Sequence, residues 1–294
     1  MPFSLPITKM HGIGNSYVLV SDSKRDLERE FGYDLLGKAL SDKSYGVGSD
    51  GILVVNQGSL APYWMRVINP DGSEAEMCGN GIRMVARYLH DLGLADASMD
   101  VEVGGVNGGK IVKPRVNGDG TVTVDMGKGE IIEGSKSLYC GGGPINEIFD
   151  GDYVSVGNPH YVVFVSSADK AKNYVPIFGK QIENHEDFQP ARTNVEFVYP
   201  VSKDELAVYV WERGAGATLA CGTGACASQF AAYKRGLTQP RASVHLPGGD
   251  LDVEVLPDDR IMMTGPAEYI FTDATIPDLE RFLSVYQDFE KRNQ

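Results

Sequence analysis

Basic residues are scarce in this sequence: 27 lysines and arginines stand against 40 aspartates and glutamates, which gives a formal net charge of −13. Nucleic acids and anionic membrane surfaces are bound through clusters of lysine and arginine. The charge balance therefore argues against both kinds of partner, and the acidity is best read as a contribution to solubility. It does not exclude an anionic substrate, because a helix terminus and a single arginine can dominate a closed pocket.

Long apolar segments and cysteines are also few. No apolar run approaches the length needed to span a bilayer, and no N-terminal stretch has the pattern of a signal peptide. The four cysteines (Cys78, Cys140, Cys221 and Cys226) lack the density and spacing of a disulfide framework or a zinc site. The five histidines show no metal-ligand spacing. We therefore expect no metal, and a reducing cytoplasm that keeps the thiols reactive.

One short motif occurs twice. Cys78-Gly79-Asn80-Gly81 and Cys221-Gly222-Thr223-Gly224 each precede an apolar, helix-like run, and they lie 143 residues apart (221 − 78). The same offset relates Gly14-Asn15 to Gly157-Asn158, and residues 51–55 to residues 194–198. A constant offset near half the chain length indicates an internal duplication.

The repeated motif places a cysteine at the N-terminus of a helix in each half. Backbone N–H groups are unpaired there and the helix dipole is positive, which favours a thiolate and lowers the thiol pKa. Flanking glycines allow a carboxylate to approach these N–H groups. Two halves related by pseudo-two-fold symmetry would direct both sulfurs at one carbon, as an inversion by proton transfer requires.

The duplication and the hydrophobic periodicity predict an α+β fold of two pseudo-symmetric lobes, each a curved, mostly antiparallel sheet wrapped around one central helix. We expect residues 1–124 and 268–294 to form the lobe that carries Cys78, and residues 125–267 the lobe that carries Cys221. A further helix is expected near residues 176–185. The tail has a helical apolar face, with Thr275 and Asp278 as its N-terminal cap, and should pack on the first lobe.

The two halves differ at positions that carry chemistry. His160 corresponds by offset to Tyr17, and Glu212-Arg213 correspond to Asn69-Pro70. An acid and an arginine on one side only would suit an asymmetric ligand, since arginine binds carboxylates in a bidentate manner. The alternative is that Glu212 and Arg213 form a purely structural pair. Their position just before Cys221 favours a role in the site instead.

At these residues the chain resembles the diaminopimelate epimerase family. The matching stretches extend over both halves almost end to end: KMHGIGNSYV, NPDGSEAEMCGNGIR, VGNPHYVVFV, RTNVEFV, WERGAGATLACGTGACA and VHLPGGDL. The resemblance implies a cofactor-independent isomerase that interconverts LL- and meso-2,6-diaminopimelate in lysine and peptidoglycan biosynthesis. It also implies that each lobe is an antiparallel, barrel-like sheet around a central helix, with the site in the cleft between the two lobes.

The resemblance also assigns roles to residues. It makes Cys78 and Cys221 the thiolate base and thiol acid, with His160 and Glu212 setting thiol protonation. Backbone N–H groups of Gly79, Asn80, Gly222 and Thr223 would bind the α-carboxylate. The other substrate-binding positions would be Asn15, Asn69, Asn158, Asn194, Glu212 and Arg213.

The chain departs from the family at a few positions. Ala217 stands where many members have Glu, Gly51 where some have Gln, and Ser16-Tyr17 where Asp-Phe is frequent. None of these removes a predicted catalytic residue. Two alternatives stay open, a racemase or epimerase of another amino acid and a two-lobed binding protein without chemistry. We expect an amino acid as the small-molecule substrate, a cytoplasmic location and a homodimer.

Overall fold

The computed structural model describes residues 3–75, 77–104, 109–141 and 146–293. The chain divides into two compact units, one formed by residues 1–124 and 266–294 and the other by residues 125–265. We call them unit 1 and unit 2, and describe each by itself.

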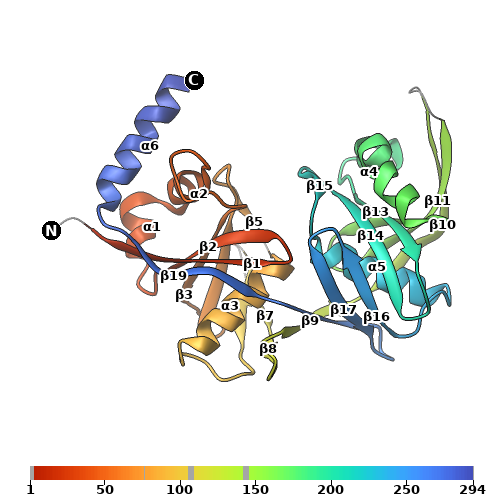
Figure 1. Ribbon diagram of the computed structural model, residues 1–294, viewed down its shortest axis with the longest axis horizontal. Helices are drawn as coiled ribbons and strands as arrows, with labels where there is room; N and C mark the ends of the chain where they lie inside the picture. Colours follow the sequence, from red (N-terminus) through yellow and green to blue (C-terminus); the bar gives the residue numbers. More distant parts are fainter. Residues whose placement is uncertain (1–2, 76, 105–108, 142–145, 294) are drawn as a thin grey trace. The chain divides into compact units, whose positions relative to one another are not determined.

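Unit 1 is a twisted sheet with one helix on its inner face and three helices on its outer face (Figure 1). The strand order is β19-β1-β2-β3-β4-β6-β7, and the short strand β5 also pairs with β4. Its elements are β1 (Leu5–Gly12), β2 (Asn15–Ser21), α1 (Asp26–Phe31), α2 (Tyr33–Ser41), β3 (Ile52–Gln57), β4 (Tyr63–Ile68), β5 (Glu74–Ala75), α3 (Gly79–Asp91), β6 (Val101–Val103), β7 (Lys110–Val112), β8 (Arg115–Val116), β19 (Glu268–Ile276) and α6 (Leu279–Asn293).

Unit 2 repeats this plan after β9 (Val122–Lys128), the strand in which the chain passes from one unit to the other. Its strands follow the order β10-β11-β12-β13-β14-β16-β17-β18, and β15 pairs with β14. The elements are β10 (Glu130–Cys140), β11 (Glu147–Ser155), β12 (Pro159–Phe164), α4 (Ala168–Glu183), the 3₁₀ helix η1 (Glu186–Phe188), β13 (Asn194–Pro200), β14 (Glu205–Glu212), β15 (Gly216–Thr218), α5 (Gly222–Lys234), β16 (Arg241–Leu246), β17 (Gly249–Val255) and β18 (Arg260–Gly265).

The duplication extends to the pairing of individual residues. Most neighbouring strands are antiparallel, but β2–β3 and β4–β6 are parallel in unit 1, as are β12–β13 and β14–β16 in unit 2. Residue pairs at the centre of the two sheets are related by the 143-residue offset: Val18↔Ile52 and Ile52↔Ile68 in unit 1, Tyr161↔Val195 and Val195↔Trp211 in unit 2. The predicted α+β fold with two similar lobes is therefore confirmed.

The central strand of each sheet is buried on both faces, as its continuous apolar sequence requires. Ile52 and Val54 of β3 face the outer cluster below α2 and α6, whereas Leu53 lies against Gly81 of α3. The same strand pattern in β13 directs residue 196 toward α5. Each sheet wraps around one helix: α3 packs on β1–β4, and α5 packs on β11–β14 and β16–β18.

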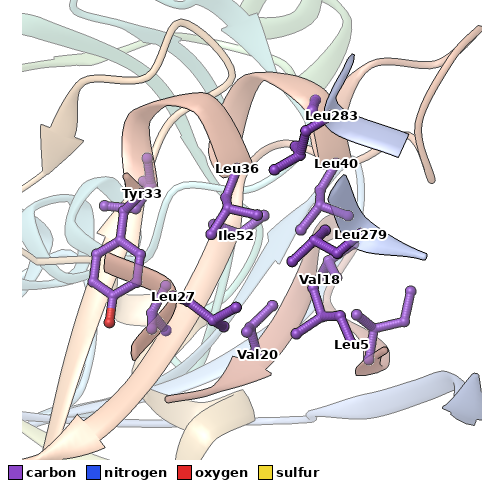
Figure 2. Packing of buried hydrophobic residues seen from close by; sticks show 14 of the residues in the cluster. Leu5, Val18, Val20, Leu27, Tyr33, Leu36, Leu40, Ile52, Leu279 and Leu283 are labelled. Atoms are coloured by element: carbon purple, nitrogen blue, oxygen red, sulfur yellow. The ribbon is translucent and has the colours of Figure 1, made fainter. Parts of the chain in front are cut away.

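The C-terminal tail completes unit 1. Strand β19 pairs with β1, and in Figure 1 the blue helix α6 lies beside the red and orange N-terminal elements. Leu279 and Leu283 of α6 enter the same apolar cluster as Leu5 and Val18 (Figure 2). Burying a leucine side chain stabilises the fold by roughly 1.5–3 kcal/mol.

Some sequence-based expectations of local structure were wrong in detail. Thr275 belongs to β19 and pairs with Pro6, so Asp278 alone caps α6, through its Oδ1 and the N–H of Arg281. The helix expected near residues 176–185 is the longer α4, which begins at Ala168 with Ser167 as its cap. Within the described part of the chain, no helix is long and apolar enough to cross a membrane.

Candidate active site

The two repeated cysteines occupy equivalent positions, each as the N-cap of the central helix of its unit. Cys78 has extended backbone angles (φ −136°, ψ 115°), and Cys221 nearly the same (φ −129°, ψ 108°). Gly81 N–H donates to Cys78 Sγ at 3.2 Å, and Gly224 N–H donates to Cys221 Sγ at 3.3 Å. Sulfur therefore takes the place that a hydroxyl or carboxylate oxygen fills in an ordinary N-cap.

The helices also end alike, which fixes their length. Gly93 and Gly236 follow α3 and α5 with positive φ angles of 67° and 69°. Their N–H groups donate to the carbonyls of His90 and Tyr233, a left-handed helix end that glycine adopts at low cost.

Around Cys78 the polar contacts come from β2 and from the helix itself. Cys78 Sγ lies 3.6 Å from Tyr17 Oη and 4.0 Å from Asn15 Oδ1. Asn80 Nδ2 donates to Asn15 Oδ1 (3.1 Å), and Asn15 Nδ2 donates to Asp50 Oδ2 (3.1 Å). Two predicted substrate residues, Asn15 and Asn80, are thus held together beside the sulfur.

A buried guanidinium lies behind this group. Arg83, one turn into α3, has no exposed surface. It donates to Asn80 Oδ1 (2.9 Å) and to the carbonyls of Gly79 (3.2 Å) and Pro266 (3.2 Å). A cation therefore stands close to the N-terminus of the helix that carries Cys78.

Cys221 has a different electrostatic environment. Burial raises the pKa of its thiol well above the usual value, and the Glu212 and Glu196 carboxylates raise it further. Contacts with Thr223 and with the Gly224 N–H oppose the shift but do not reverse it. The expectation of a lowered thiol pKa is therefore wrong for Cys221, because loss of solvent at a side chain only 4% exposed outweighs the helix terminus.

The surroundings of Glu212, at the end of β14, favour its protonated form more than water does. Desolvation raises the pKa of its carboxyl group, partly offset by hydrogen bonds from Thr218 and from the Cys221 thiol. Thr218 Oγ1 donates to Glu212 Oε1 at 2.5 Å. The acid that sequence analysis placed just before Cys221 is thus close enough to interact with its thiol.

His160 is fully buried on β12. Its Nδ1 donates to Glu196 Oε1 at 2.7 Å, and its Nε2 lies 3.0 Å from Asn158 Oδ1. Asn158 Nδ2 in turn donates to Thr223 Oγ1 at 3.3 Å. The predicted site residues His160, Asn158 and Thr223 therefore form one connected group with Cys221.

A second group in unit 2 holds Arg213. Its backbone N–H donates to Asn194 Oδ1 (2.9 Å), and its Nη1 donates to the carbonyl of Ala191 (2.9 Å). Asn194 Nδ2 donates to the carbonyl of Pro159 (2.8 Å). Asn194 thereby connects the arginine loop, residues 213–215, to the start of β12. The Arg213 side chain is exposed.

Among the described residues, the hydrogen bonds of Asn69 are with residues of its own turn. It follows β4 directly and bonds Ser73 across the 69–73 turn, where its Nδ2 donates to Ser73 Oγ at 3.0 Å. Its proposed role in substrate binding is not explained by contacts with the other predicted residues of unit 1.

Sequence reasoning missed three buried charged residues that support these groups. They are Glu196 beside His160, Arg83 beside Asn80, and Glu183, which accepts from Gly214 N–H (2.9 Å) and Trp211 Nε1 (2.8 Å) below the arginine loop. A signal was present for Glu196. It is a single acid inside an apolar strand, and its offset partner is Leu53.

The described residues include no group of three or more histidine, cysteine, aspartate or glutamate side chains placed to hold a metal ion. The predicted site residues of the two units are thiols, amides, one imidazole, carboxylates and an arginine. Such groups bind amino acids and move protons.

Comparison with known proteins agrees with this chemistry. The family model for diaminopimelate epimerase matches residues 7–132 and 152–270. A diaminopimelate epimerase from Desulfitobacterium hafniense is 40% identical over 284 residues, which cover 93% of this chain and 99% of that protein. One from Desulforudis audaxviator is 43% identical over 282 residues, covering 91% and 98%.

Solved structures share the fold at much lower identity. A hydroxyproline epimerase from Agrobacterium vitis has a TM-score of 0.66 at 16% identity and covers 94% of this chain and 93% of its own. A phenazine biosynthesis protein of the PhzF family from Bacillus anthracis also has a TM-score of 0.66 at 16% identity, covering 93% and 99%. At this identity the similarity establishes the two-lobed architecture alone.

Proposed function

This chain belongs to the diaminopimelate epimerase family, and we propose that it interconverts LL- and meso-2,6-diaminopimelate by proton transfer between two cysteines without a cofactor. The observation that carries the proposal is the repeated N-cap. Each unit presents one thiol at the start of a buried helix, with the same backbone geometry and the same N–H donor.

The chemical step needs one base and one acid. In one direction the Cys78 thiolate takes the proton from the α-carbon, so that an S–H bond forms as the C–H bond breaks. The Cys221 thiol then gives its proton to the opposite face of the same carbon and becomes the thiolate. We propose that Cys221 is the cysteine that is protonated before the reaction, because burial and two carboxylates raise its pKa. The reverse reaction exchanges the two roles.

The carbanion-like state must be stabilised while the α-carbon lacks its proton. The first-turn N–H groups of Gly79, Asn80, Gly222 and Thr223 have no carbonyl partner within their helices. We propose that they bind the α-carboxylate, on which negative charge grows in the transition state. Removal of water by substrate binding would strengthen these interactions and prevent exchange of the transferred proton.

Recognition of the rest of the substrate is assigned to the asymmetric residues. Arg213 would bind a carboxylate, and Asn15, Asn69, Asn158, Asn194 and Glu212 would bind the ammonium and carboxylate groups. Glu212 directly, and His160 through Asn158 and Thr223, would set the protonation of the Cys221 thiol. The one-sided arginine favours a substrate with a second charged end over a simple apolar amino acid.

The test is α-deuterium incorporation in heavy water. LL-diaminopimelate, lysine, proline and hydroxyproline are incubated with the enzyme, and exchange is followed by mass spectrometry. We expect rapid exchange and epimerisation with diaminopimelate only. Preferential turnover of another amino acid would support the other-epimerase alternative, and no exchange with any of them would support a binding protein without chemistry.

Cysteine substitutions test the two-thiol mechanism. Cys78→Ser and Cys221→Ser should each abolish epimerisation, because a serine hydroxyl is far too weak an acid to supply the anion that a thiolate provides. Cys226→Ala is the matched control, since Cys226 is a buried thiol on the same helix as Cys221. Normal epimerisation by either serine variant would refute the mechanism.

The biological setting follows from the same family membership. We propose that the enzyme acts in the cytoplasm, as a homodimer, in the synthesis of lysine and peptidoglycan precursors. Sedimentation equilibrium would test the dimer, and a monomer across the working concentration range would contradict it.

A further inference from the structure

A single buried carboxylate distinguishes the central strand of unit 2 from that of unit 1. Glu196 of β13 has no exposed surface, and its offset partner in β3 is Leu53. Burying a carboxylate in place of an apolar side chain costs stability unless the charge is well paired. The fold itself therefore does not require an acid at this position.

The pairing of Glu196 is incomplete. Its Oε1 accepts from His160 Nδ1 at 2.7 Å, but among the described residues no hydrogen-bond donor contacts its Oε2. The carboxylate also lies directly against the first turn of α5, because a Cβ at Gly224 would be only 2.8 Å from Glu196 Oε1. Gly224 is the residue whose N–H donates to Cys221 Sγ.

A continuous series of polar contacts leads from this carboxylate to the thiol. It runs from Glu196 to His160, from His160 Nε2 to Asn158 Oδ1 (3.0 Å), from Asn158 Nδ2 to Thr223 Oγ1 (3.3 Å) and from Thr223 Oγ1 to Cys221 Sγ (3.5 Å). A series of this kind fixes the orientation of each member.

Unit 1 contains only the part of this series that lies next to the cysteine. Asn80 and Asn15 are bonded to each other, as are their counterparts Thr223 and Asn158. The positions of His160 and Glu196 are taken by Tyr17 and Leu53, so the strand behind Cys78 contributes no carboxylate. The central strand thus places a carboxylate behind the helix of Cys221 and an apolar side chain behind the helix of Cys78.

We propose that Glu196 is a positioning residue that orients His160 and holds Cys221 in its thiol form, so that the two symmetric cysteines have distinct resting roles. The proposal rests on the two-thiol function argued above. The titratable groups that face Cys221 are Glu196 from β13 and Glu212 from β14, with His160 of β12 reaching it through Asn158 and Thr223. A negative charge this close opposes formation of the thiolate.

The proposal predicts a change in the pH profile of kcat/KM. Activity requires one thiolate and one thiol, so its alkaline limb reports ionisation of the thiol and its acid limb protonation of the base. Glu196→Gln keeps the shape and can still accept from His160, but it removes the charge. The alkaline limb should move to lower pH by about one unit, the size of a shift caused by one neighbouring charge, while the acid limb stays in place.

Further variants separate charge from packing. Glu196→Leu reproduces the residue of unit 1 and should also move the alkaline limb to lower pH. The loss of kcat should be larger, because His160 loses the carboxylate to which it donates. The introduced side chain is apolar and fills the site, so this variant remains informative if Glu196→Gln folds poorly. Glu196→Asp retains the charge and should keep the limb near its wild-type position.

Asp152→Asn is the control for loss of a buried carboxylate. Asp152 belongs to the same unit and pairs with Arg235 at the end of α5 (2.6 Å). This variant should lower Tm without moving either limb.

The outcomes are distinguishable. An active wild-type enzyme with folded Glu196→Gln and Glu196→Leu variants whose alkaline limbs coincide with wild type would refute the role of Glu196. An equal displacement in Asp152→Asn would refute it as well, by showing a general effect of stability. A wild-type enzyme that does not exchange the α-proton of diaminopimelate would instead refute the proposed function.

Discussion

Replacing Arg213 by alanine tests which end of the substrate the asymmetric half of the site recognises. The variant loses the guanidinium and its bond to the carbonyl of Ala191, but the backbone N–H of residue 213 can still donate to Asn194. The side chain is exposed, so the free energy of unfolding should change by less than about 0.5 kcal/mol. The arginine loop therefore stays in place while its charge is removed.

The expected effect is on binding. A hydrogen bond to a charged group contributes roughly 1.5–3 kcal/mol, and each 1.4 kcal/mol is a factor of about ten in affinity. KM for LL-diaminopimelate should therefore rise roughly 10- to 150-fold, with a smaller change in kcat. The assay is steady-state epimerisation over a wide range of substrate concentration, at one pH and ionic strength.

Arg241→Ala provides the matched control. Arg241 is another exposed arginine of unit 2, and it forms a bidentate pair with Asp252 on β17. Its loss should leave KM unchanged. If Arg213→Ala has a KM within about twofold of wild type, or if Arg241→Ala raises KM equally, Arg213 does not bind the substrate and the argument for a doubly charged substrate fails.

Three further perturbations have definite expected outcomes. Tyr17→Phe removes a hydroxyl 3.6 Å from Cys78 Sγ, so the acid limb of the kcat/KM profile should move to higher pH; an unchanged limb would mean that the hydroxyl does not stabilise the thiolate. Burial raises the pKa of the Cys140 thiol from 9.0 to about 11, so the stability that its protonated form contributes is complete below pH 9 and is lost as the pH rises toward 11. In urea titrations, the difference in unfolding free energy between wild type and Cys140→Ala should therefore be constant below pH 9 and shift against wild type above it; a constant difference up to pH 11 would contradict the shift. Leu279→Ala leaves a cavity at a fully buried position in the unit 1 cluster and should lower the free energy of unfolding in urea by about 2–5 kcal/mol. Val285→Ala, on an exposed face of the same helix, should lower it little. Equal losses would mean that α6 is not anchored through Leu279.

Local patterns in the sequence were sufficient for the frame of the site. The Cys-Gly-x-Gly motif determines a helix start through residues that are close in the chain, so both N-caps could be predicted from it. The 143-residue offset predicted a second copy of the fold because equal hydrophobic patterns favour equal strand registers. The pairings of β2–β3–β4 and β12–β13–β14 coincide for this reason.

The protonation of the site depended on segments distant in the chain. Glu196 and His160 are 36 residues apart and meet only because β12 and β13 pair in parallel. The helix terminus, a local feature, predicted a lowered thiol pKa for Cys221. Burial by strands from across unit 2 reversed that prediction.

The sequence by itself determined which residues repeat, where the two cysteines lie on their helices and which positions break the symmetry. These properties follow from short-range geometry and from periodicity, both of which can be read along the chain. Tertiary structure alone decided that residues 268–276 join the first lobe as a strand paired with β1. It also decided that Glu196 lies against the helix of Cys221 and Leu53 against the helix of Cys78. The physical reason is that desolvation and charge proximity depend on distance in space, which strand pairing sets and spacing along the chain does not.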